Sequence, residues 1–563
     1  MDNRNVFVAI ALSMAVLLFW GAFFETPRQV KENQTLNNVQ TNQNETQTDI
    51  TPNINQERVV KKISRKDALT ENDRIIIENE KVKGSISLKG AIFDDLSFKN
   101  YKKDLKSEDN VVLLNPKDIE DGYFIESGWA SVGNEAEVPG VDSLWQVKGN
   151  RVLSEKKDVV LEWNNEKGLI FKKTIKLDEK YLFKIKQEVK NNTSSKINLY
   201  PYSQITRNKK PDDVMGFYIL HEGFIGVFDG ELKEDDYDDI KDKKIVRNSD
   251  NGWLGITDKY WVTAIVPPKD KNFKSTFLYK DNFRANYILN SPVTINPKSI
   301  SENEVRLFVA AKEVETVDGY AESENIEKFD LTIDWGWFYF FTKPLFFIID
   351  YLFKFSGNFG IAIVLITLAI RVIFFPLANY SFRSMAKMKA VQPEMIRLKE
   401  LHKEDKVKLQ QEMMALYRKE KINPASGCLP ILIQIPFFFA IYKMLFISLE
   451  MRHQPFFGWI QDLSAKDPTT IFNLFGLIPW DPPGFLIIGI WPMLMGLSMY
   501  VQQKLNPAPA DPIQAKIFAF FPLFLTIILA PFPSGLVVYW TVNNILTIAQ
   551  QWVIMRKTTV KTN

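Results

Sequence analysis

The chain has 563 residues, a net charge of +3 and a 46% share of hydrophobic residues. A chain of this length is too long for one domain. Cys428 is the only cysteine, so an intramolecular disulfide or a cysteine-held metal cluster is excluded. The three histidines, His221, His402 and His453, fall in separate segments. We therefore expect no catalytic residues, no metal site and no cofactor, and the chain is not predicted to be an enzyme.

The amino terminus is predicted to be a membrane anchor over residues 1–25. Val6–Phe24 carries no charge and is long enough to cross a bilayer. A cleavable signal peptide is the alternative, but Phe23 and Phe24 stand where small residues should precede the cut. Residues 26–58 are almost free of apolar side chains and are predicted to form a flexible polar linker.

Residues 59–330 change to short runs that alternate β-branched or aromatic residues with polar ones, separated by Gly, Asn and Asp. This pattern predicts strands, and so long a stretch predicts a large all-β sandwich domain. Such charged strands must lie outside the bilayer.

Residues 331–354 are rich in aromatic residues but contain Lys343, Pro344 and Asp350, which favours an amphipathic helix in the membrane interface. A buried helix of a soluble domain is the alternative.

The last third, residues 355–556, is predicted to be a core of five spanning helices, which makes six with the anchor and defines a polytopic α-helical membrane protein. Residues 557–563 would form a short tail. The five predicted spans are Phe359–Phe382, Cys428–Leu449, Phe485–Gln503, Ile517–Leu529 and Leu536–Met555.

Arg371 lies in the middle of the first predicted core span, where the nearest flanking charges are Lys354 and Arg383. A charge at that depth costs a few kcal/mol at least, so it normally faces protein or a wet cavity and marks function. We expect a polar site inside the membrane.

Basic residues predict the orientation of the chain. Residues 383–427 contain eleven Lys or Arg against six acids, which places this loop and both termini in the cytoplasm. Residues 59–330 are then outside.

The loop over residues 383–427 has helical periodicity and is predicted to be a helical hairpin broken near His402–Asp405. It is either a solvated charged hairpin or a docking arm for a partner. The candidate docking residues are Lys387, Lys389, Arg397, Lys399, Lys406, Lys408, Met413 and Arg418.

Five segments in order resemble the YidC-type membrane protein insertases, in the form found in Gram-negative bacteria. They are Arg371 itself, SMAKMKAVQPEM at Ser384–Met395, the run at Gln410–Phe438, MRHQPFFGWIQDLSAKDP at Met451–Pro468 and FPSGLVVYWTVNNILTIAQQ at Phe532–Gln551. In this family the outer domain is a β-supersandwich, and the spans surround a hydrophilic groove closed toward the outside.

Polar side chains at helical spacing are consistent with such a groove. Their alternative role is to hold helices together by hydrogen bonds. The candidate groove residues are Thr367, Arg371, Gln434, Ser498, Gln502, Tyr539, Trp540, Asn543 and Thr547. Two features depart from the family pattern: Lys443 adds a charge to the predicted span Cys428–Leu449 and can snorkel outward, and Trp540 follows Tyr539 where relatives can have two tyrosines.

The resemblance implies a protein of the bacterial inner membrane that inserts nascent membrane proteins. Its expected partners are these clients, the ribosome, a Sec-type translocon and the lipid bilayer, without direct binding of DNA. A channel or secondary transporter with a buried arginine is the main alternative, although paired repeats and charged relay partners are missing from the sequence. A sugar-processing enzyme in the outer domain is a second alternative, because the family's domain resembles sugar-mutarotase folds.

Overall fold

The computed structural model describes residues 63–559 apart from 133–134, 213, 215–219, 424–428, 477, 479, 481, 484–486 and 507–511. The predicted anchor, the predicted linker, Cys428 and residues 560–563 lie outside the described part of the chain.

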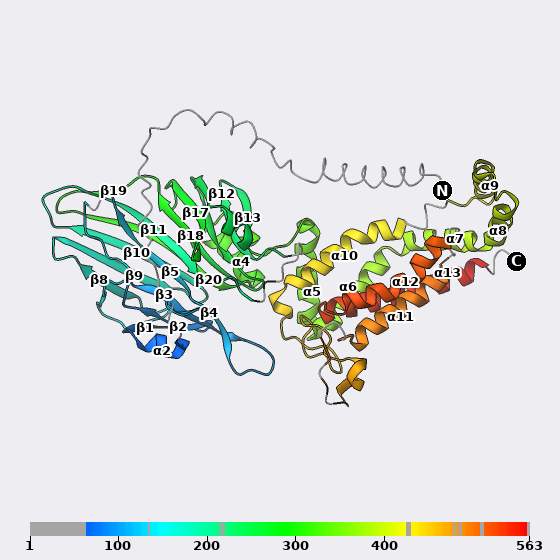
Figure 1. The fold of residues 1–563 in the computed structure, drawn as a ribbon, viewed down its shortest axis with the longest axis horizontal. Helices are drawn as coiled ribbons and strands as arrows, with labels where there is room; N and C mark the ends of the chain where they lie inside the picture. Colours follow the sequence, from blue (N-terminus) through cyan, green and yellow to red (C-terminus); the bar gives the residue numbers. More distant parts are fainter. Residues whose placement is uncertain are drawn as a thin grey trace. The chain divides into compact units, whose positions relative to one another are not determined.

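The first described part is a sandwich of two sheets, which confirms the predicted all-β domain (Figure 1). The larger sheet has eleven strands in the order β14-β17-β18-β11-β5-β3-β2-β1-β7, with β19 beside β11 and β4 beside β3. The other has nine strands in the order β13-β12-β15-β16-β20-β10-β9-β8-β6. Pairing is antiparallel except between β1 and β7.

The strands of the larger sheet are β1 (Arg74–Glu78), β2 (Val82–Ser87), β3 (Ile92–Lys102), β4 (Asn110–Leu114), β5 (Tyr123–Ser131), β7 (Val152–Leu153), β11 (Ile197–Arg207), β14 (Ile245–Ser249), β17 (Phe273–Lys280), β18 (Asn282–Leu289) and β19 (Val293–Ile295). Those of the smaller sheet are β6 (Gln146–Val147), β8 (Val159–Asn164), β9 (Leu169–Leu177), β10 (Leu182–Asn191), β12 (Gly223–Phe228), β13 (Glu231–Asp236), β15 (Gly252–Thr257), β16 (Trp261–Val266) and β20 (Ile300–Ala311). Helices α2 (Arg65–Thr70), α3 (Tyr237–Asp242) and α4 (Val314–Ser323) accompany them.

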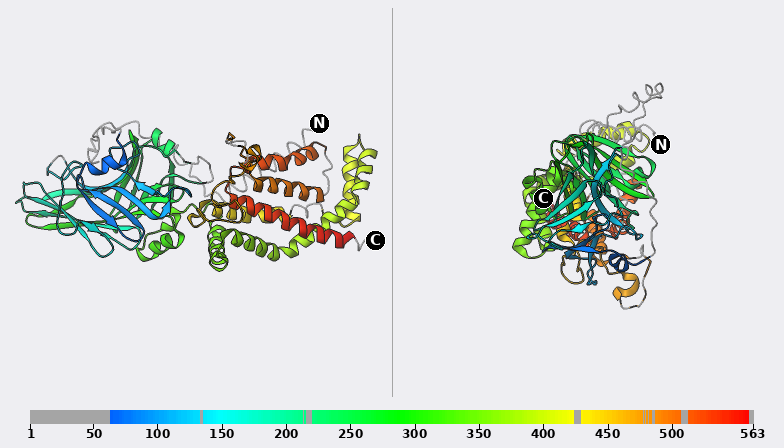
Figure 2. Two further views of the ribbon diagram at one scale, coloured as in Figure 1. Left: turned by 90° about the horizontal axis from the view of Figure 1, so that it is seen from below. Right: turned by 90° about the vertical axis from the view of Figure 1, so that its left-hand side faces the viewer.

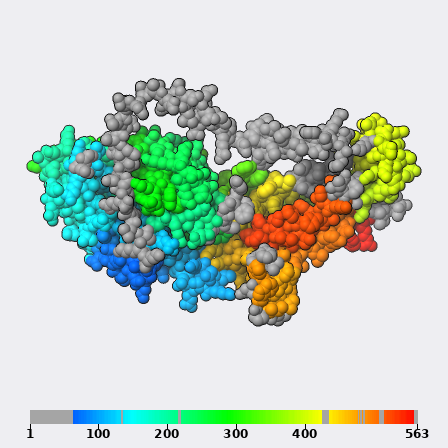
Figure 3. Space-filling view, in the orientation of Figure 1, coloured from blue at the N-terminus to red at the C-terminus, as the bar shows by residue number. Residues whose placement is uncertain are grey.

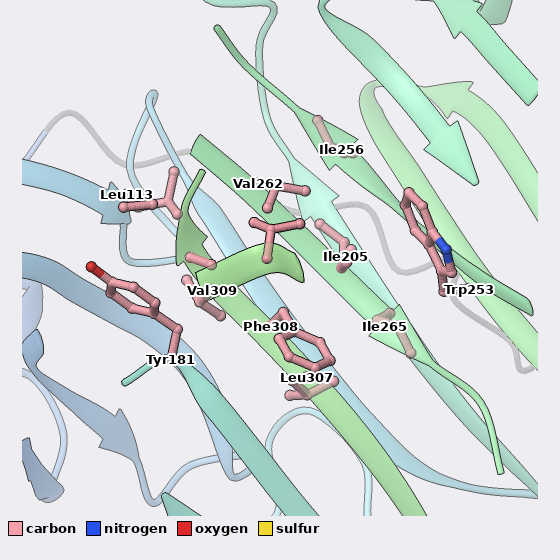
Figure 4. Packing of buried hydrophobic residues seen from close by; sticks show 14 of the residues in the cluster. Leu113, Tyr181, Ile205, Trp253, Ile256, Val262, Ile265, Leu307, Phe308 and Val309 are labelled. Carbon is pink, nitrogen blue, oxygen red and sulfur yellow. The ribbon is translucent and has the colours of Figure 1, made fainter. Parts of the chain in front are cut away.

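Alternation along the strands builds the core between the sheets. In β9 every second residue of LIFKKTIKL is buried, and the register places Phe183 of β10 between Leu177 and Leu307. Figure 4 shows the packing of residues such as Trp253 and Phe308, which are fully buried. Burial of such large side chains contributes about 1.5–3 kcal/mol each.

The second described part is helical (Figure 2). After the short 3₁₀ turn η1 (Phe329–Thr332), its elements are α5 (Tyr339–Ser356), α6 (Phe359–Ile373), α7 (Phe375–Ala390), α8 (Gln392–Leu401), α9 (Lys406–Lys419), α10 (Leu429–Ile447), η3 (Leu449–Met451), η4 (Ile471–Gly476), α11 (Ile490–Leu505), α12 (Pro512–Leu529) and α13 (Ser534–Thr559).

The predicted span Phe359–Phe382 is not one continuous helix, because the helix breaks at Phe374. Helices α6 and α7 meet there at 68°. Pro376 stands in the first turn of α7, where its missing N–H is tolerated, whereas inside a continuous helix its ring would clash with the preceding turn. Arg371 therefore lies in the last turn of α6, next to the bend.

Other boundaries also differ from the predicted ones. Arg383, Lys387 and Lys389 lie on α7, which continues the helix to Ala390 before α8 and α9 begin. The helix predicted over 331–354 starts at Tyr339, and α13 continues into the predicted tail as far as Thr559. Within the described residues, no single helix combines the length and apolar composition needed to cross a bilayer, and only the bent pair α6–α7 does so when taken together.

Glu450 joins the sandwich part to the helical part. Its Oε1 accepts a hydrogen bond from the N–H of Val314 at the start of α4, at 3.0 Å. Burial raises the pKa of Glu450 to about 7, and the nearby carboxylates of Glu313 and Asp350 act in the same direction. A carboxyl with a raised pKa in the folded state holds its proton better when folded than when unfolded.

We therefore predict that the protein loses stability as the pH rises through the interval between the normal glutamate pKa and about 7. The expected loss is about 3 kcal/mol at most, as a shift of one unit corresponds to about 1.4 kcal/mol. Glu450→Gln, neutral at every pH, should remove this pH dependence, while Glu322→Gln on the exposed surface of α4 should retain it. Thermal unfolding of the purified protein between pH 5 and 8 measures both slopes. Equal slopes in the two variants would contradict the assignment.

Candidate functional site

Arg371 binds neutral amides on two other helices. Its Nη2 and Nε lie 2.6 and 3.1 Å from Oδ1 of Asn543 on α13, and its Nη2 lies 3.4 Å from Oε1 of Gln434 on α10. Among the described residues no carboxylate forms an ion pair with Arg371. The guanidinium is therefore hydrogen-bonded but keeps its full positive charge, as the missing acid in the core sequence predicts.

The guanidinium faces a partly open cavity with an empty volume of about 500 Å³. Four of the eight other predicted groove residues line the same cavity: Thr367, Gln434, Tyr539 and Asn543. Residues that the sequence analysis did not single out complete the wall and make much of it apolar: Ile370, Phe374, Leu377, Ala378 and Phe437. Three of these come from the bend and from α7, so the break at Phe374 shapes the cavity.

Asn543, Thr547 and Gln551 form a polar stripe on α13, and part of it forms hydrogen bonds within the helix or to a neighbouring residue instead of facing the cavity. The Thr547 hydroxyl donates to the carbonyl of Asn543 at 2.6 Å, and the Thr367 hydroxyl donates to the carbonyl of Ile363 at 2.6 Å. Gln551, further along the stripe, donates to Oδ1 of Asn506 at 2.9 Å. Thr547 and Gln551 do not line the cavity, so only the Asn543 end of the stripe belongs to the site.

The predicted span Phe485–Gln503 contributes no residue to the cavity. Ser498 accepts a hydrogen bond from Nδ2 of Asn544 at 3.0 Å and is buried, so it joins α11 to α13. Gln502, one turn further along α11, does not line the cavity either. For Ser498 the role of holding helices together, which the sequence left open, fits the geometry.

Tyr539 and Trp540 point in different directions. Tyr539 is buried and lines the cavity. Trp540 instead packs against Phe438 of α10, with ring centroids 4.8 Å apart, and against the cluster around Met495 and Val537. Trp540 therefore packs between helices instead of lining the cavity.

Lys443, the second charge on α10, is paired. Its Nζ lies 2.6 Å from Oδ2 of Asp334, which precedes α5. A carboxylate therefore meets this lysine within the protein, which the sequence did not predict. The sequence contained both residues, but their separation along the chain concealed the pair.

The segment between α10 and α11 is fixed to the end of the helices opposite Arg371. Asp467 is buried and accepts hydrogen bonds from the backbone N–H of Trp491 at 2.9 Å and the indole N–H of Trp459 at 3.1 Å. The backbone N–H of Ser534 donates to the carbonyl of Ala465 at 2.7 Å. Phe456 packs so closely on Gly360 that a Cβ there would lie 1.9 Å from its ring. These contacts hold the starts of α6, α11 and α13 together.

The candidate docking residues lie on three helices away from the cavity. Lys387 and Lys389 are exposed on α7, Arg397 and Lys399 on α8, and Lys408 and Arg418 on α9. Met413 is half-buried, and the hydroxyl of Tyr417 on α9 donates to Sδ of Met395 on α8 at 3.8 Å. Lys406 begins α9. Helices α8 and α9 thus pack as a pair whose charges point outward.

No group of His, Cys, Asp and Glu side chains that could hold a metal ion occurs in the described ranges. The site consists of a desolvated cation, neutral amides and apolar walls. Such a set can bind an anionic or polar chain and can lower its cost of leaving water.

Comparison with known proteins places this arrangement in a class of inner-membrane proteins with a periplasmic domain. The profile described as YidC periplasmic domain matches residues 74–348, and the profile described as 60Kd inner membrane protein matches residues 351–561. The membrane protein insertase YidC of Pelagibacter ubique (strain HTCC1062) is 55% identical over 564 residues, covering 100% of both chains. That of Methylorubrum extorquens (strain PA1) is 45% identical over 602 residues, covering 100% of this chain and 96% of the relative. The chain belongs to the YidC family of membrane protein insertases.

A solved structure titled "Active YidC insertase crystal structure with the first transmembrane domain resolved" is also similar. It has 16% sequence identity and a TM-score of 0.35, and the match covers 85% of this chain and 92% of that one.

The bond between Arg371 and Asn543 yields a prediction. Hydrogen bonds to charged groups contribute about 1.5–3 kcal/mol and neutral ones about 0.5–1.5 kcal/mol. Asn543→Ala should therefore destabilise the protein more than Asn544→Ala, which removes a similarly buried amide of α13 bound to a neutral hydroxyl. Thermal unfolding of both variants in detergent measures the difference. An equal or smaller loss for Asn543→Ala would mean that the bond to Arg371 carries no charge-assisted stabilisation.

Proposed function

We propose that this chain acts as a membrane protein insertase that takes the polar segment of a nascent membrane protein into the cavity at Arg371. The observation that carries the proposal is a half-buried guanidinium that neutral amides bind and no described carboxylate neutralises. Its charge therefore remains available to a visiting anionic group. Because the relatives are named membrane protein insertases, we take the visiting chain to be a membrane protein.

The energetic problem of insertion is the polar tail of the client. An unpaired polar group costs about 2–7 kcal/mol in an apolar medium, and a carboxylate costs far more. Arg371 can form a charge-assisted pair with such a carboxylate, while Gln434 and Asn543 can exchange hydrogen bonds with its backbone. The tail therefore moves toward the outside in steps that are each less costly than direct transfer into lipid.

The apolar helix of the client leaves toward the bilayer. Helix α12 exposes a dense row of large apolar side chains, part of the orange-red surface in Figure 3: Ile517, Phe518, Phe520, Phe521, Leu523, Phe524, Ile527 and Ile528. These side chains suit contact with lipid. A client helix of about 20 apolar residues gains its own transfer free energy on reaching the same lipid phase, so neither nucleotide nor covalent chemistry is needed.

For the membrane topology we propose six spans, with the bent pair α6–α7 as one of them and the anchor in residues 1–25 as another. Both termini and the pair α8–α9 would lie in the cytoplasm, and the β-sandwich in the periplasm. The exposed basic residues of α8 and α9 would then meet a ribosome, and a Sec-type translocon would act beside the core. A channel or transporter, the alternative from the sequence, is not favoured by the family.

The charge of Arg371 generates the principal functional prediction. Arg371→Ala should impair the insertion of clients with acidic outer tails most, because it removes the cation that pairs with them. Arg371→Lys retains a charge but loses the planar fork, so it should keep partial activity. Insertion of one client into inverted membrane vesicles, with its tail acids replaced stepwise by amides, measures the dependence.

The matched control is Asn544→Ala, which alters a buried amide of the same helix outside the cavity. It should reduce insertion equally for acidic and neutral tails, if at all. If Arg371→Ala also reduces every version of the tail equally, Arg371 only holds the helices in place and the electrostatic mechanism is wrong.

The topology has a separate test. In a Cys428→Ser background, a cysteine at the exposed Lys190 of β10 should react with a membrane-impermeant thiol reagent added to cells with a permeable outer membrane. A cysteine at the exposed Glu404, between α8 and α9, should react only after the inner membrane is opened. Labelling of position 404 in intact spheroplasts would reverse the proposed orientation.

A further inference from the structure

A second, much larger hollow lies outside the helical core. It is a groove with about 2290 Å³ of empty volume, and its lining includes strand β4 and the neighbouring residues Asp109 and Asn115. The aromatic residues Tyr123, Tyr260 and Trp261 also line it. Arg452, which directly follows η3 of the helical part, closes one wall and donates from Nη2 to the carbonyl of Lys103 at 2.8 Å. The groove is therefore built by both the sandwich and the outer end of the helices.

Strand β4 offers this groove an unpaired edge. Within the described sheets β4 pairs only with β3, and it leaves the regular strand order of the larger sheet (Figure 1). Asn110, Val111, Val112 and Leu113 all line the groove, and Oδ1 of Asn110 has no hydrogen-bond partner. A free strand edge in a groove can accept an extended polypeptide through backbone hydrogen bonds.

Among the described residues, the acidic side chains on the groove wall are mostly paired within the protein, whereas several of its cationic side chains are not. Seven lining side chains are cationic and five are acidic. The acids are largely engaged within the protein: Arg207 pairs with Asp258, and Lys209 pairs with Asp121 and Asp212.

By contrast, several cations of the wall have no carboxylate within ion-pair distance in the described structure. They are Lys83, Lys103, Lys259 and Arg452. The guanidinium of Arg452 stands over the rings of Trp261 and Tyr260 at 5.7 and 6.0 Å, and Nζ of Lys259 lies 4.8 Å from the Tyr260 ring centroid. Aromatic faces orient these cations without cancelling their charge.

We propose that this groove binds an extended acidic polypeptide segment, which adds to the free edge of β4 and places its carboxylates against Lys103, Lys259 and Arg452. The size of the groove exceeds what a single small anion requires, and the strand edge specifies an extended backbone. If the segment is the translocated tail of a client, that identity depends on the proposed insertase function. Binding of an acidic peptide to the groove does not.

The test uses the purified full chain and a fluorescent peptide of alternating threonine and glutamate, followed by fluorescence anisotropy. Peptides with glutamine or lysine in place of glutamate should bind at least about tenfold more weakly, a loss of about 1.4 kcal/mol. A threonine–glutamate peptide that is N-methylated at every backbone nitrogen keeps the charge but cannot donate backbone hydrogen bonds, so it should also bind more weakly. Affinity for the threonine–glutamate peptide should fall as salt rises.

Combined replacement of Lys103, Lys259 and Arg452 by glutamine should lower the affinity at least about tenfold. The control Lys190→Gln changes an exposed cation of β10 in the other sheet and should leave binding unchanged. If the triple variant unfolds, the peptide series and the salt dependence still decide with the unmodified chain.

Three results would overturn the inference. Equal binding of the N-methylated peptide would exclude strand addition, and equal binding of the lysine peptide would exclude charge recognition. Arg371→Ala separates this site from the membrane cavity: peptide binding retained in that variant supports the groove, whereas binding lost there would place the peptide at Arg371. Failure of Arg371→Ala to affect insertion would refute the proposed function and leave the groove result standing.

Discussion

The helical part depends on the partial burial of one guanidinium, that of Arg371, which has no counter-ion among the described residues. Such a group cannot be removed from water unless hydrogen-bond acceptors replace its hydration, and here Asn543 and Gln434 supply them from two different helices. This requirement fixes the position of α10 and α13 relative to the end of α6. Neutral acceptors satisfy geometry but not charge. A carboxylate in their place would stabilise the same packing and abolish the attraction for an anionic visitor.

Two lysines of the helical part differ from Arg371 in that carboxylates pair with them. Lys443 pairs with Asp334, and Lys343 pairs with Asp318 and Asp330, at distances of 2.6–3.0 Å. These pairs hold α5 and α10 to the segment that follows the sandwich, and carboxylates suit that purpose because they fix a contact strongly. The helical part therefore uses acids where a permanent contact is needed and amides at the cavity.

Much of the site could be predicted from the sequence because polar residues are conspicuous among apolar ones. Arg371, Gln434, Thr367 and Asn543 were identified in that way, and all four line one cavity. What failed depends on helix rotation and on bends. Ser498 has the same spacing signal as Asn543, but α11 turns it toward Asn544. Pro376 was a visible signal for the break at Phe374, yet the apolar run around it outweighed that signal. The all-β domain followed from alternation, whereas its strand order depends on long-range pairing that no local pattern encodes.

Helix α10 makes the relation between the two parts of the protein concrete. It carries Gln434 at the cavity and Lys443 toward its other end, and Glu450 follows it to meet α4. The partner of Lys443, Asp334, belongs to the segment after the sandwich and not to any of its strands. Loss of the strands would therefore leave that pair intact, whereas loss of the segment would remove this ion pair from the half-buried Lys443. The cavity at Arg371 is lined wholly by residues after Phe359, so it can tolerate changes in the sandwich, provided that the chain from Asp334 through α5 remains in place.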